Sequence, residues 1–452
     1  MNIIIAGAGM VGTTLTRLLC AEGHDVTLVD RNSRLLEQNV EIYDVMGVCG
    51  NCASMDTLSH AGIQDADLLI AVTESDEVNL LCCTVAHGLR KDLHTIARIR
   101  HPEYREQAFK LREVFGLSLI ISPDLQAAKE MERLLKFPGF LRREVFVRGT
   151  NEIVELRVDE TSKLKDISLI EMAGIVKCKV LVCAVLRDGQ AITPGGNFVL
   201  REGDRVFVTA PTENLAMLLK NLGIITRRVR HVMLCGYGRI CHYLAASLLK
   251  SRISVTIVEK DPRRCQEAAA ALPEANVILG DASDMELLAS EGLHDVDALV
   301  TLTKLEELNI IISLQAIHFG VPQVITKLGH ITNQSVINSL KLGSMVCPKD
   351  LVVSNILRYV RAMQNQTGAA VSLHHIADGQ VEALEFLVDE HTRHCNTPLK
   401  DLKLKNNVLI AGITHGAKTA LPNGGSTFQV GDTVMVVTGN RGSVRQLNDI
   451  FA

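Results

Sequence analysis

The sequence contains one segment twice, and this duplication restricts the possible fold more than any other feature. Residues 3–12 (IIIAGAGMVG) pass from an apolar run through a glycine-rich turn, and residues 232–241 (VMLCGYGRIC) repeat the pattern 229 positions later. An acidic residue follows each copy, and Glu259 also stands 229 positions after Asp30. Two independent features share one offset, which indicates a duplicated unit.

The correspondence extends through the rest of the chain. A Gly-Gly turn and a following Gly-Asp pair occur at 195–204 and again at 424–432. A chain of 452 residues is long enough for two to four domains. We therefore expect the order A-B-A′-B′, with segments 1–137, 140–223, 229–365 and 370–452. Further matched positions are Gly50-Asn51-Cys52 with Gly280-Asp281-Ala282, Thr73 with Thr303, Asn79 with Asn309, Arg98 with Lys327, and His101 with His330.

The A segments alternate continuous apolar runs, such as 68–72 and 299–302, with helical patterns. This is typical of a parallel sheet covered by helices on both faces, so we predict two Rossmann-like α/β N-lobes. The B segments have short strand patterns separated by Gly, Pro and Asn turns, which predicts small α+β C-lobes. Proline starts the helical patterns 124–136 and 349–364, which we expect to cross from A to B. Linkers are expected near 137–139, 223–230 and 365–368.

Composition excludes several classes of protein. The formal net charge is −4, Trp is absent and aromatic residues make up 4%, so nucleic acid is not an expected partner. No apolar segment approaches the roughly 20 residues that span a bilayer, and the N-terminus lacks the basic start of a secretory signal. Twelve cysteines spread along the chain suit reduced thiols in a cytosol. We expect a soluble protein that stays where it is made.

Each glycine turn has the features of a dinucleotide cradle. The first glycine permits the bend, the second lets phosphate approach the backbone, and the third lets the helix pack against the strand. The acids Asp30 and Glu259 would accept hydrogen bonds from ribose hydroxyls and repel a 2′-phosphate, which favours NAD(H), ATP or ADP over NADP(H). Cys241 replaces the third glycine of the second copy, which makes the helix–strand contact less close but leaves the phosphate-facing turn at Gly236 and Gly238. Arg98 either brings a cation to the phosphates or is a strand-end charge.

Other motifs favour structural interpretations. The Cys49-x-x-Cys52 spacing is that of a redox pair, but the second copy has Leu279 and Ala282 there, so we favour a turn. The histidines at 374–375 and 391–394 match no metal site, so we expect surface histidines and no metal. The basic stretch 226–230 is more typical of a solvent-exposed linker between domains than of a nucleic-acid-binding patch.

With these features, the whole chain resembles the TrkA family, the cytosolic nucleotide-binding regulatory subunits of Trk-type potassium uptake systems, built from two tandem pairs of KTN (RCK) N-lobes and TrkA-C C-lobes. The segments VTESDEVN (72–79) and ARIRHPEY (97–104) also carry the resemblance. It implies a homotetramer whose eight N-lobes form a ring, cytoplasmic and peripheral on the inner face of the membrane. There a membrane-embedded potassium-translocating subunit would be gated by NAD(H), ATP or ADP.

The resemblance also implies two sets of nucleotide-binding residues. Departures at Cys241 and at Lys304-Leu305, where the first copy has Glu74-Ser75, leave open whether both sites take one ligand. The first set is Gly7, Ala8, Gly9, Met10, Val11, Gly12, Asp30, Asn51, Cys52, Thr73, Glu74 and Arg98; the second is Gly236, Tyr237, Gly238, Arg239, Ile240, Glu259, Asp281, Ala282 and Thr303.

Two rival functions follow from the same turns. An NAD-dependent oxidoreductase would need an acid, base or nucleophile from a substrate domain, and the B segments show no evident catalytic cluster. A ligand-sensing DNA regulator would need a helix-turn-helix module and a basic face, which the sequence lacks. We therefore expect a protein that is not an enzyme and has no catalytic residues.

Overall fold

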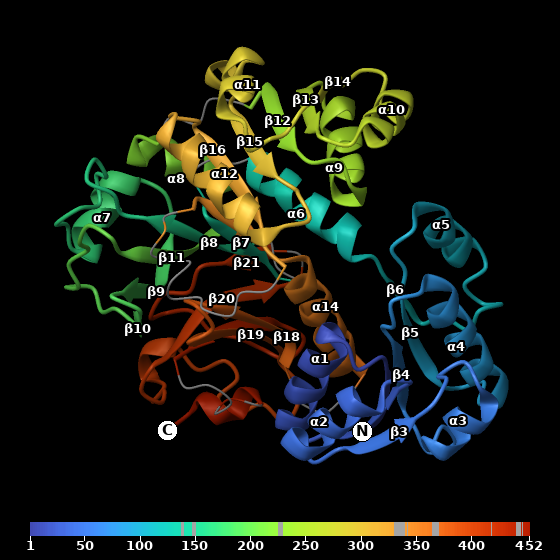
Figure 1. Ribbon diagram of the computed structural model, residues 1–452. Helices are drawn as coiled ribbons and strands as arrows, with labels where there is room; N and C mark the ends of the chain where they lie inside the picture. Colours follow the sequence, from blue (N-terminus) through green and yellow to red (C-terminus); the bar gives the residue numbers. More distant parts are fainter. Residues whose placement is uncertain are drawn as a thin grey trace. The chain divides into compact units, whose positions relative to one another are not determined.

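The computed structural model describes residues 1–136, 140–146, 151–224, 229–329, 340, 342–363, 370–416, 418–439, 444 and 446–452. Three expected linkers lie mostly outside these residues, as does His330. Four sheets follow one another along the chain, alternating between six parallel strands and five antiparallel strands (Figure 1). The prediction of Rossmann-like N-lobes, each followed by a smaller C-lobe, is confirmed.

The two N-lobes have identical topology. Their strand orders are β3-β2-β1-β4-β5-β6 and β14-β13-β12-β15-β16-β17, which is the 3-2-1-4-5-6 order of dinucleotide-binding sheets. In the first N-lobe, α1 and α2 cover one face of the sheet, and α3, α4 and α5 cover the other (Figure 1). Strand order reverses between β1 and β4, and ligands of such sheets bind where the strands beside that reversal end.

The N-lobe strands are apolar because both sheet faces are buried under helices. Residues 3–6 and 68–71 are all buried, and the cores of the two lobes are separate apolar clusters. The elements of the first N-lobe are β1 (Asn2–Ala6), α1 (Met10–Ala21), β2 (Asp25–Asp30), α2 (Ser33–Tyr43), β3 (Met46–Cys49), α3 (Met55–His60), β4 (Leu68–Ala71), α4 (Asp76–Leu89), β5 (His94–Arg98), α5 (Pro102–Lys110), β6 (Leu119–Ile121) and α6 (Pro123–Lys136).

The second N-lobe repeats this series after the first C-lobe. Its elements are β12 (His231–Cys235), α9 (Arg239–Lys250), β13 (Ser254–Glu259), α10 (Pro262–Ala271), β14 (Asn276–Leu279), α11 (Met285–Ser290), a 3-10 turn (Leu293–Asp295), β15 (Ala298–Thr301), α12 (Glu306–His318), β16 (Gln323–Lys327), β17 (Ser344–Val346) and α14 (Pro348–Met363).

The C-lobes are antiparallel sheets with the orders β10-β9-β11-β8-β7 and β18-β19-β22-β20-β21. The first also has two α-helices, whereas the described part of the second has only 3-10 turns. The elements are β7 (Arg142–Val145), β8 (Asn151–Arg157), α7 (Leu169–Val176), β9 (Leu181–Arg187), β10 (Gln190–Ile192), β11 (Arg205–Pro211) and α8 (Thr212–Leu222), then β18 (Ala370–Ile376), β19 (Val381–Leu387), β20 (Val408–His415), β21 (Lys418–Ala420), β22 (Thr433–Thr438) and the turns Leu399–Asp401 and Leu447–Ile450.

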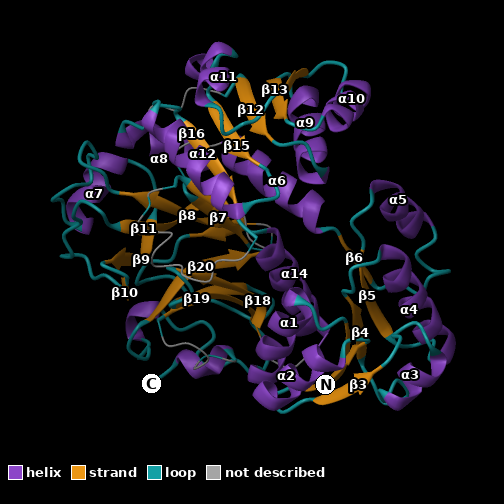
Figure 2. Cartoon of the chain, viewed as in Figure 1, coloured by secondary structure: helices purple, strands orange, loops and turns teal. Residues whose placement is uncertain are grey.

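The two C-lobe sheets pack face to face and share one apolar core (Figure 2). Phe207 and Cys183 of the first sheet join Ala383 and Met435 of the second in that core. At its edge Arg205 Nη1 donates to both carboxylate oxygens of Asp378, at 2.8 and 2.9 Å. The C-lobes therefore form one body.

Each crossover helix is divided between two compact units of the chain. By contacts the chain forms two compact units: residues 1–128 with 347–359, and residues 129–346 with 360–452. The amino-terminal part of α14 thus packs with the first N-lobe, where Tyr359 Oη is 2.8 Å from Nδ1 of His94. The carboxy-terminal part of α6 packs in the other unit, where Gln323 Nε2 donates to the Leu134 carbonyl at 2.9 Å. Gln323 and His94 are matched positions at the start of β16 and β5.

Two further observations concern side chains considered in the sequence. His391 and His394 are exposed as expected, but His374 and His375 are half-buried, because β18 is covered and the His374 ring lies 4.7 Å from the ring of Phe146. No group of three potential metal ligands is found among the described residues. No helix in the described part of the chain is long and apolar enough to cross a membrane.

Candidate functional site

The first glycine of each turn is required by the backbone. Gly7 and Gly236 follow β1 and β12 and have φ values of +113° and +103°. Residues other than glycine rarely adopt such backbone angles. A Cβ on either would lie 3.0 Å from the backbone nitrogen of Thr73 or Thr303. The two turns therefore approach the ends of β4 and β15 closely, at the point where strand order reverses.

The second glycine of each turn faces open space. A Cβ built on Gly9 or Gly238 would meet nothing within 4 Å. These residues are the N-caps of α1 and α9, and neither helix has a side-chain cap. The amides of the first helical turn therefore remain available, and the helix dipole favours an anion there. This geometry fits a phosphate group.

The carboxylates of Asp30 and Glu259 are held against the turns by matching hydrogen bonds. The amide of Ala8 donates to Asp30 Oδ2 at 2.6 Å, and the amide of Tyr237 donates to Glu259 Oε2 at 2.6 Å. The other oxygen of each carboxylate accepts a hydrogen bond from the backbone amide two residues later in the chain, at 2.9 and 3.0 Å. Glutamate and aspartate thus occupy the same position although their side chains differ in length.

An asparagine fixes the opposite wall of each site. In the first N-lobe, Oδ1 of Asn79 accepts from the amide and hydroxyl of Thr73, at 2.8 and 2.7 Å, and Nδ2 donates to the carbonyls of Thr73 and Arg98. Asn309 makes the same four contacts with Thr303 and Lys327 in the second. This arrangement, which we call the asparagine clamp, joins the ends of two neighbouring strands.

The cation beside each clamp points to the same place. Arg98 Nη2 donates to the Thr73 carbonyl at 2.5 Å, and Lys327 Nζ donates to the Thr303 carbonyl at 2.5 Å. Burial lowers the pKa of Arg98 to about 10, and the nearby Arg100 adds to this effect. The guanidinium is still charged at neutral pH, and its buried Nε has no hydrogen-bond partner among the described residues. Arg98 can therefore offer a donor to an anion.

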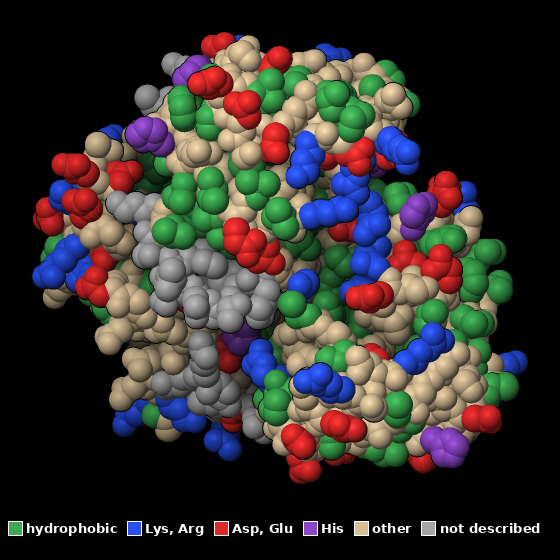
Figure 3. Space-filling model, viewed as in Figure 1, with side chains coloured by type: hydrophobic (Ala, Val, Ile, Leu, Met, Phe, Trp, Pro, Cys, Tyr) green, Lys and Arg blue, Asp and Glu red, His purple; other side chains and the backbone are tan. Residues whose placement is uncertain are grey.

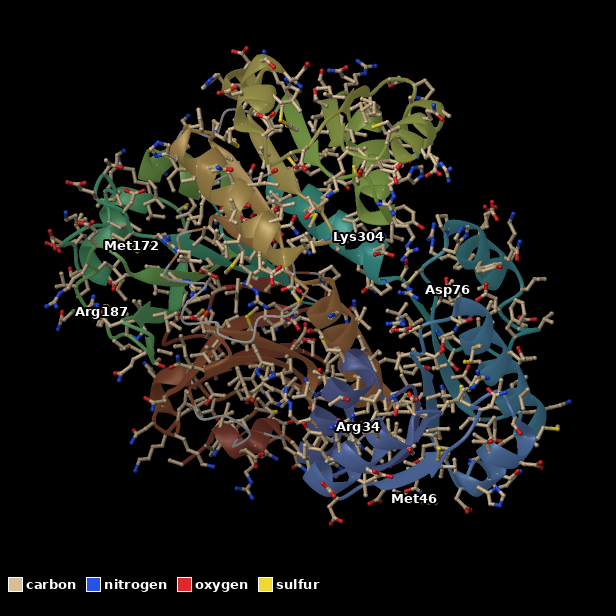
Figure 4. All side chains as sticks on the ribbon, viewed as in Figure 1. Arg34, Met46, Asp76, Met172, Arg187 and Lys304 are labelled. Atoms are coloured by element: carbon tan, nitrogen blue, oxygen red, sulfur yellow. The ribbon has the colours of Figure 1, made fainter. Side chains whose placement is uncertain are left out.

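Asp76, the first residue of α4, holds the segment that follows Arg98 (Figure 4). Its Oδ2 accepts from the amides of Arg100 and His101, at 2.8 and 2.7 Å.

At the matched turn of the second lobe, the labelled Lys304 lies just before α12, where the first copy has Glu74. The two sites thus have similar backbones and different charges.

The remaining residues suggested by the resemblance lie on the same turns. Asn51 and Asp281 accept the amide two residues on, at 3.3 and 2.9 Å, and the hydrogen bonds from Ser283 lower the pKa of Asp281. Gly7, Ala8, Val11, Gly12, Cys52, Ile240 and Ala282 are buried, Gly9, Met10, Asn51, Glu74, Arg239 and Asp281 are exposed, and Thr73, Gly236, Tyr237, Gly238 and Thr303 are half-buried.

Cys52 lies with Cys82 in the apolar core of the first N-lobe. It is buried, and a hydrogen bond from Cys82 lowers its pKa, whereas Cys49 is exposed. All twelve cysteines are free thiols.

Comparison with known proteins supplies the family. The TrkA-N domain model matches residues 3–123 and 232–348, and the TrkA-C domain model matches residues 153–223 and 383–452. The Trk system potassium uptake protein TrkA homolog of Archaeoglobus fulgidus is 30% identical over 100% of both chains. Its counterpart in Haemophilus influenzae is 29% identical over 100% of this chain and 98% of that one. The chain belongs to the TrkA family.

Solved structures agree with the TrkA-family fold. The GsuK channel has a TM-score of 0.62 at 17% identity, over 97% of this chain and 76% of that one. The GsuK channel bound to NAD has a TM-score of 0.59 at 16% identity, over the same shares. At these identities the likeness shows the fold alone.

Sequence reasoning left Asn79 and Asn309 out of the sites of this TrkA-family chain. Both are fully buried and join the ends of two neighbouring strands beside the glycine turn. The signal was present, because each asparagine recurs six residues after its threonine. Glycine and carboxylate spacing is a known motif with a stated mechanism, whereas a buried asparagine shows its role only through its hydrogen bonds.

Proposed function

We propose that this chain is the cytosolic nucleotide-binding regulatory subunit of a Trk-type potassium uptake system. The observation that carries the proposal is a set of hydrogen bonds that is the same in both N-lobes. In each, a carboxylate accepts from an amide of the glycine turn, and the asparagine of the clamp accepts from the threonine amide. The relatives named for Trk potassium uptake align along the entire chain, which supports the same role here.

We propose NAD(H), ATP or ADP as the ligands. A bound nucleotide supplies a polyphosphate and a ribose diol. The amides at Gly9 and Gly238 face open space that suits the phosphates, and Asp30 and Glu259 are placed to accept from ribose hydroxyls. A related fold, the GsuK channel, has been solved with NAD, which supports this ligand class. The residues suggested by the resemblance remain our proposed binding sets.

We further propose that the chain assembles as a homotetramer on a membrane-embedded potassium-translocating subunit. Large apolar side chains are exposed on the N-lobes, among them Phe109 at 75% and Ile311 at 50%. Figure 3 shows hydrophobic side chains gathered over α12 and along the α4–α5 edge of the first N-lobe. Exposed apolar groups of this kind mark interaction surfaces. Mass measurement in solution tests this, and Phe109→Asp should weaken assembly.

Gating requires that the nucleotide bind one ring shape better than the other. Four equivalent sites that each discriminate about tenfold would contribute about 1.4 kcal/mol apiece, and their sum of about 5.5 kcal/mol moves a two-state ring from about 1:99 to 99:1. Modest discrimination at each site is therefore enough if the four copies change shape together.

The decisive experiment combines binding and flux. Asp30→Ala and Gly9→Asp should each weaken nucleotide binding to the folded chain, with Asp56→Ala on the exposed face of α3 as the matched control. Flux of K⁺ through a co-purified Trk-type membrane subunit should then respond to nucleotide with the unaltered chain and lose that response with both variants. Unchanged titration curves for both variants would contradict the proposal. Steady oxidation of NADH with an added electron acceptor would instead favour the oxidoreductase.

A further inference from the structure

Lys349 lies on the glycine turn of the first N-lobe although it comes from the second half of the sequence. It is the second residue of α14, and its Nζ atom is 2.8 Å from Sδ of Met10. Met10 is the first residue of α1 and directly follows Gly9. Since residues 347–359 pack with residues 1–128 in one compact unit, this contact lies within that unit.

The partner of this ammonium group is chemically weak. A lysine ammonium has three donors and pairs best with anions, whereas a thioether sulfur is only a weak acceptor. The contact with Met10 is the ammonium group's one hydrogen bond among the described residues, and no acid there forms an ion pair with it. Lys349 therefore places a positive charge, without an ion-pair partner among the described residues, beside Met10 at a helix start that favours an anion.

The second glycine turn carries its own cation at the matched position. Arg239 stands where the first turn has Met10, 229 positions earlier, and Arg239 is exposed. Both turns thus have a positive side chain next to the helix start. In the second it is part of the turn, and in the first it is delivered by α14.

The other crossover helix does not carry this charge. Lys349 follows Cys347-Pro348, and the matching residue after Ser122-Pro123 at the start of α6 is Asp124. A lysine at the start of a crossover helix is therefore found in α14 and not in α6.

We propose that Lys349 binds the terminal phosphate of a nucleoside triphosphate held at the first glycine turn, so that α14 senses how many phosphates the nucleotide has. This inference rests on the proposed nucleotide function and names how that site is regulated. Helix α14 runs on to Met363 and so continues beyond residue 359, where the first unit ends. A contact at Lys349 therefore acts on a helix that leads towards the second C-lobe.

The test compares ATP, ADP and AMP by calorimetric titration of the full chain, with Glu259→Ala present throughout so that the first site dominates. Lys349→Gln should weaken ATP binding by about fivefold to tenfold, because one partly exposed charged contact is lost, and should change AMP binding by less than twofold. Lys349→Arg should retain the preference for ATP. The matched control is Lys110→Gln, which removes an exposed lysine paired with Glu106.

Hydrogen exchange gives a second readout that does not depend on affinity. ATP, but not AMP, should slow exchange in residues 348–359 of the chain with Lys349, and this difference should vanish with Lys349→Gln. Equal weakening of all three nucleotides, or none, would overturn the inference while leaving nucleotide binding intact. If the Glu259→Ala chain binds none of the three, the proposed function of the first site is wrong and the inference falls with it.

Discussion

Replacing Gly12 with alanine should displace the first glycine turn. An added Cβ would lie 1.8 Å from the carbonyl oxygen of Gly7, and real Cβ contacts do not fall below 3.0 Å, so turn and helix must separate by more than 1 Å. Overpacking of this kind costs up to about 3 kcal/mol, and alanine regains about 1 kcal/mol as the better helix former. We therefore expect a net loss of about 2 kcal/mol, confined to the first N-lobe.

The same displacement should affect binding, because phosphate depends on amides held at hydrogen-bonding distance. We expect nucleotide affinity at the first site to fall by at least about tenfold, the equivalent of one lost charge-assisted hydrogen bond. The assay is nucleotide titration in a Glu259→Ala background, together with native-state hydrogen exchange of α1, which localises the loss of stability to one lobe.

The second copy provides the matched control. Cys241 occupies the position of Gly12 and is fully buried, so that turn already accommodates a side chain. Its N-cap differs accordingly, with φ of −141° at Gly238 against −69° at Gly9. Cys241→Ala should therefore cost only about 1 kcal/mol of packing. Normal α1 protection and normal affinity in Gly12→Ala would refute the reasoning.

Three further predictions concern stability. Asn79→Ala should cost about 2–4 kcal/mol in the first N-lobe, because the Thr73 amide and the Arg98 carbonyl lose partners, and Asn309→Ala should cost as much in the second; a loss below 1 kcal/mol by hydrogen exchange would contradict the clamp. Asp378→Ala should cost about 1–2 kcal/mol in urea unfolding, and a double-mutant cycle with Arg205→Met should show coupling between the C-lobe sheets. Burial raises the pKa of Cys235 to about 12 from its ordinary 9.0. As pH rises, this thiol ionises in the unfolded chain before it does so in the folded chain. Its contribution to the free energy of unfolding is therefore fully present below pH 9 and falls by about 1.4 kcal/mol per pH unit up to pH 12. Cys235→Ala should make the free energy of unfolding less dependent on pH in this range.

Much of the site could be predicted because its determinants are local. Gly7 and Gly236 are needed for their backbone angles, and Asp30 and Glu259 stand at a fixed spacing from them, so the motif is visible in a single chain. The half-burial of His374 was missed for the opposite reason. Its exposure depends on Phe146, which lies more than 200 residues away.

The sequence by itself determined the duplication, the parallel and antiparallel sheets, and the position of each cradle, because glycine turns and apolar strand runs act over a few residues. Only the tertiary structure decided that the C-lobe sheets share a core, that α6 and α14 are each divided between the two compact units, and that Lys349 reaches Met10. These contacts join segments that local propensity does not connect. They form because strand and helix faces left apolar after each lobe folds must be buried against another part of the chain.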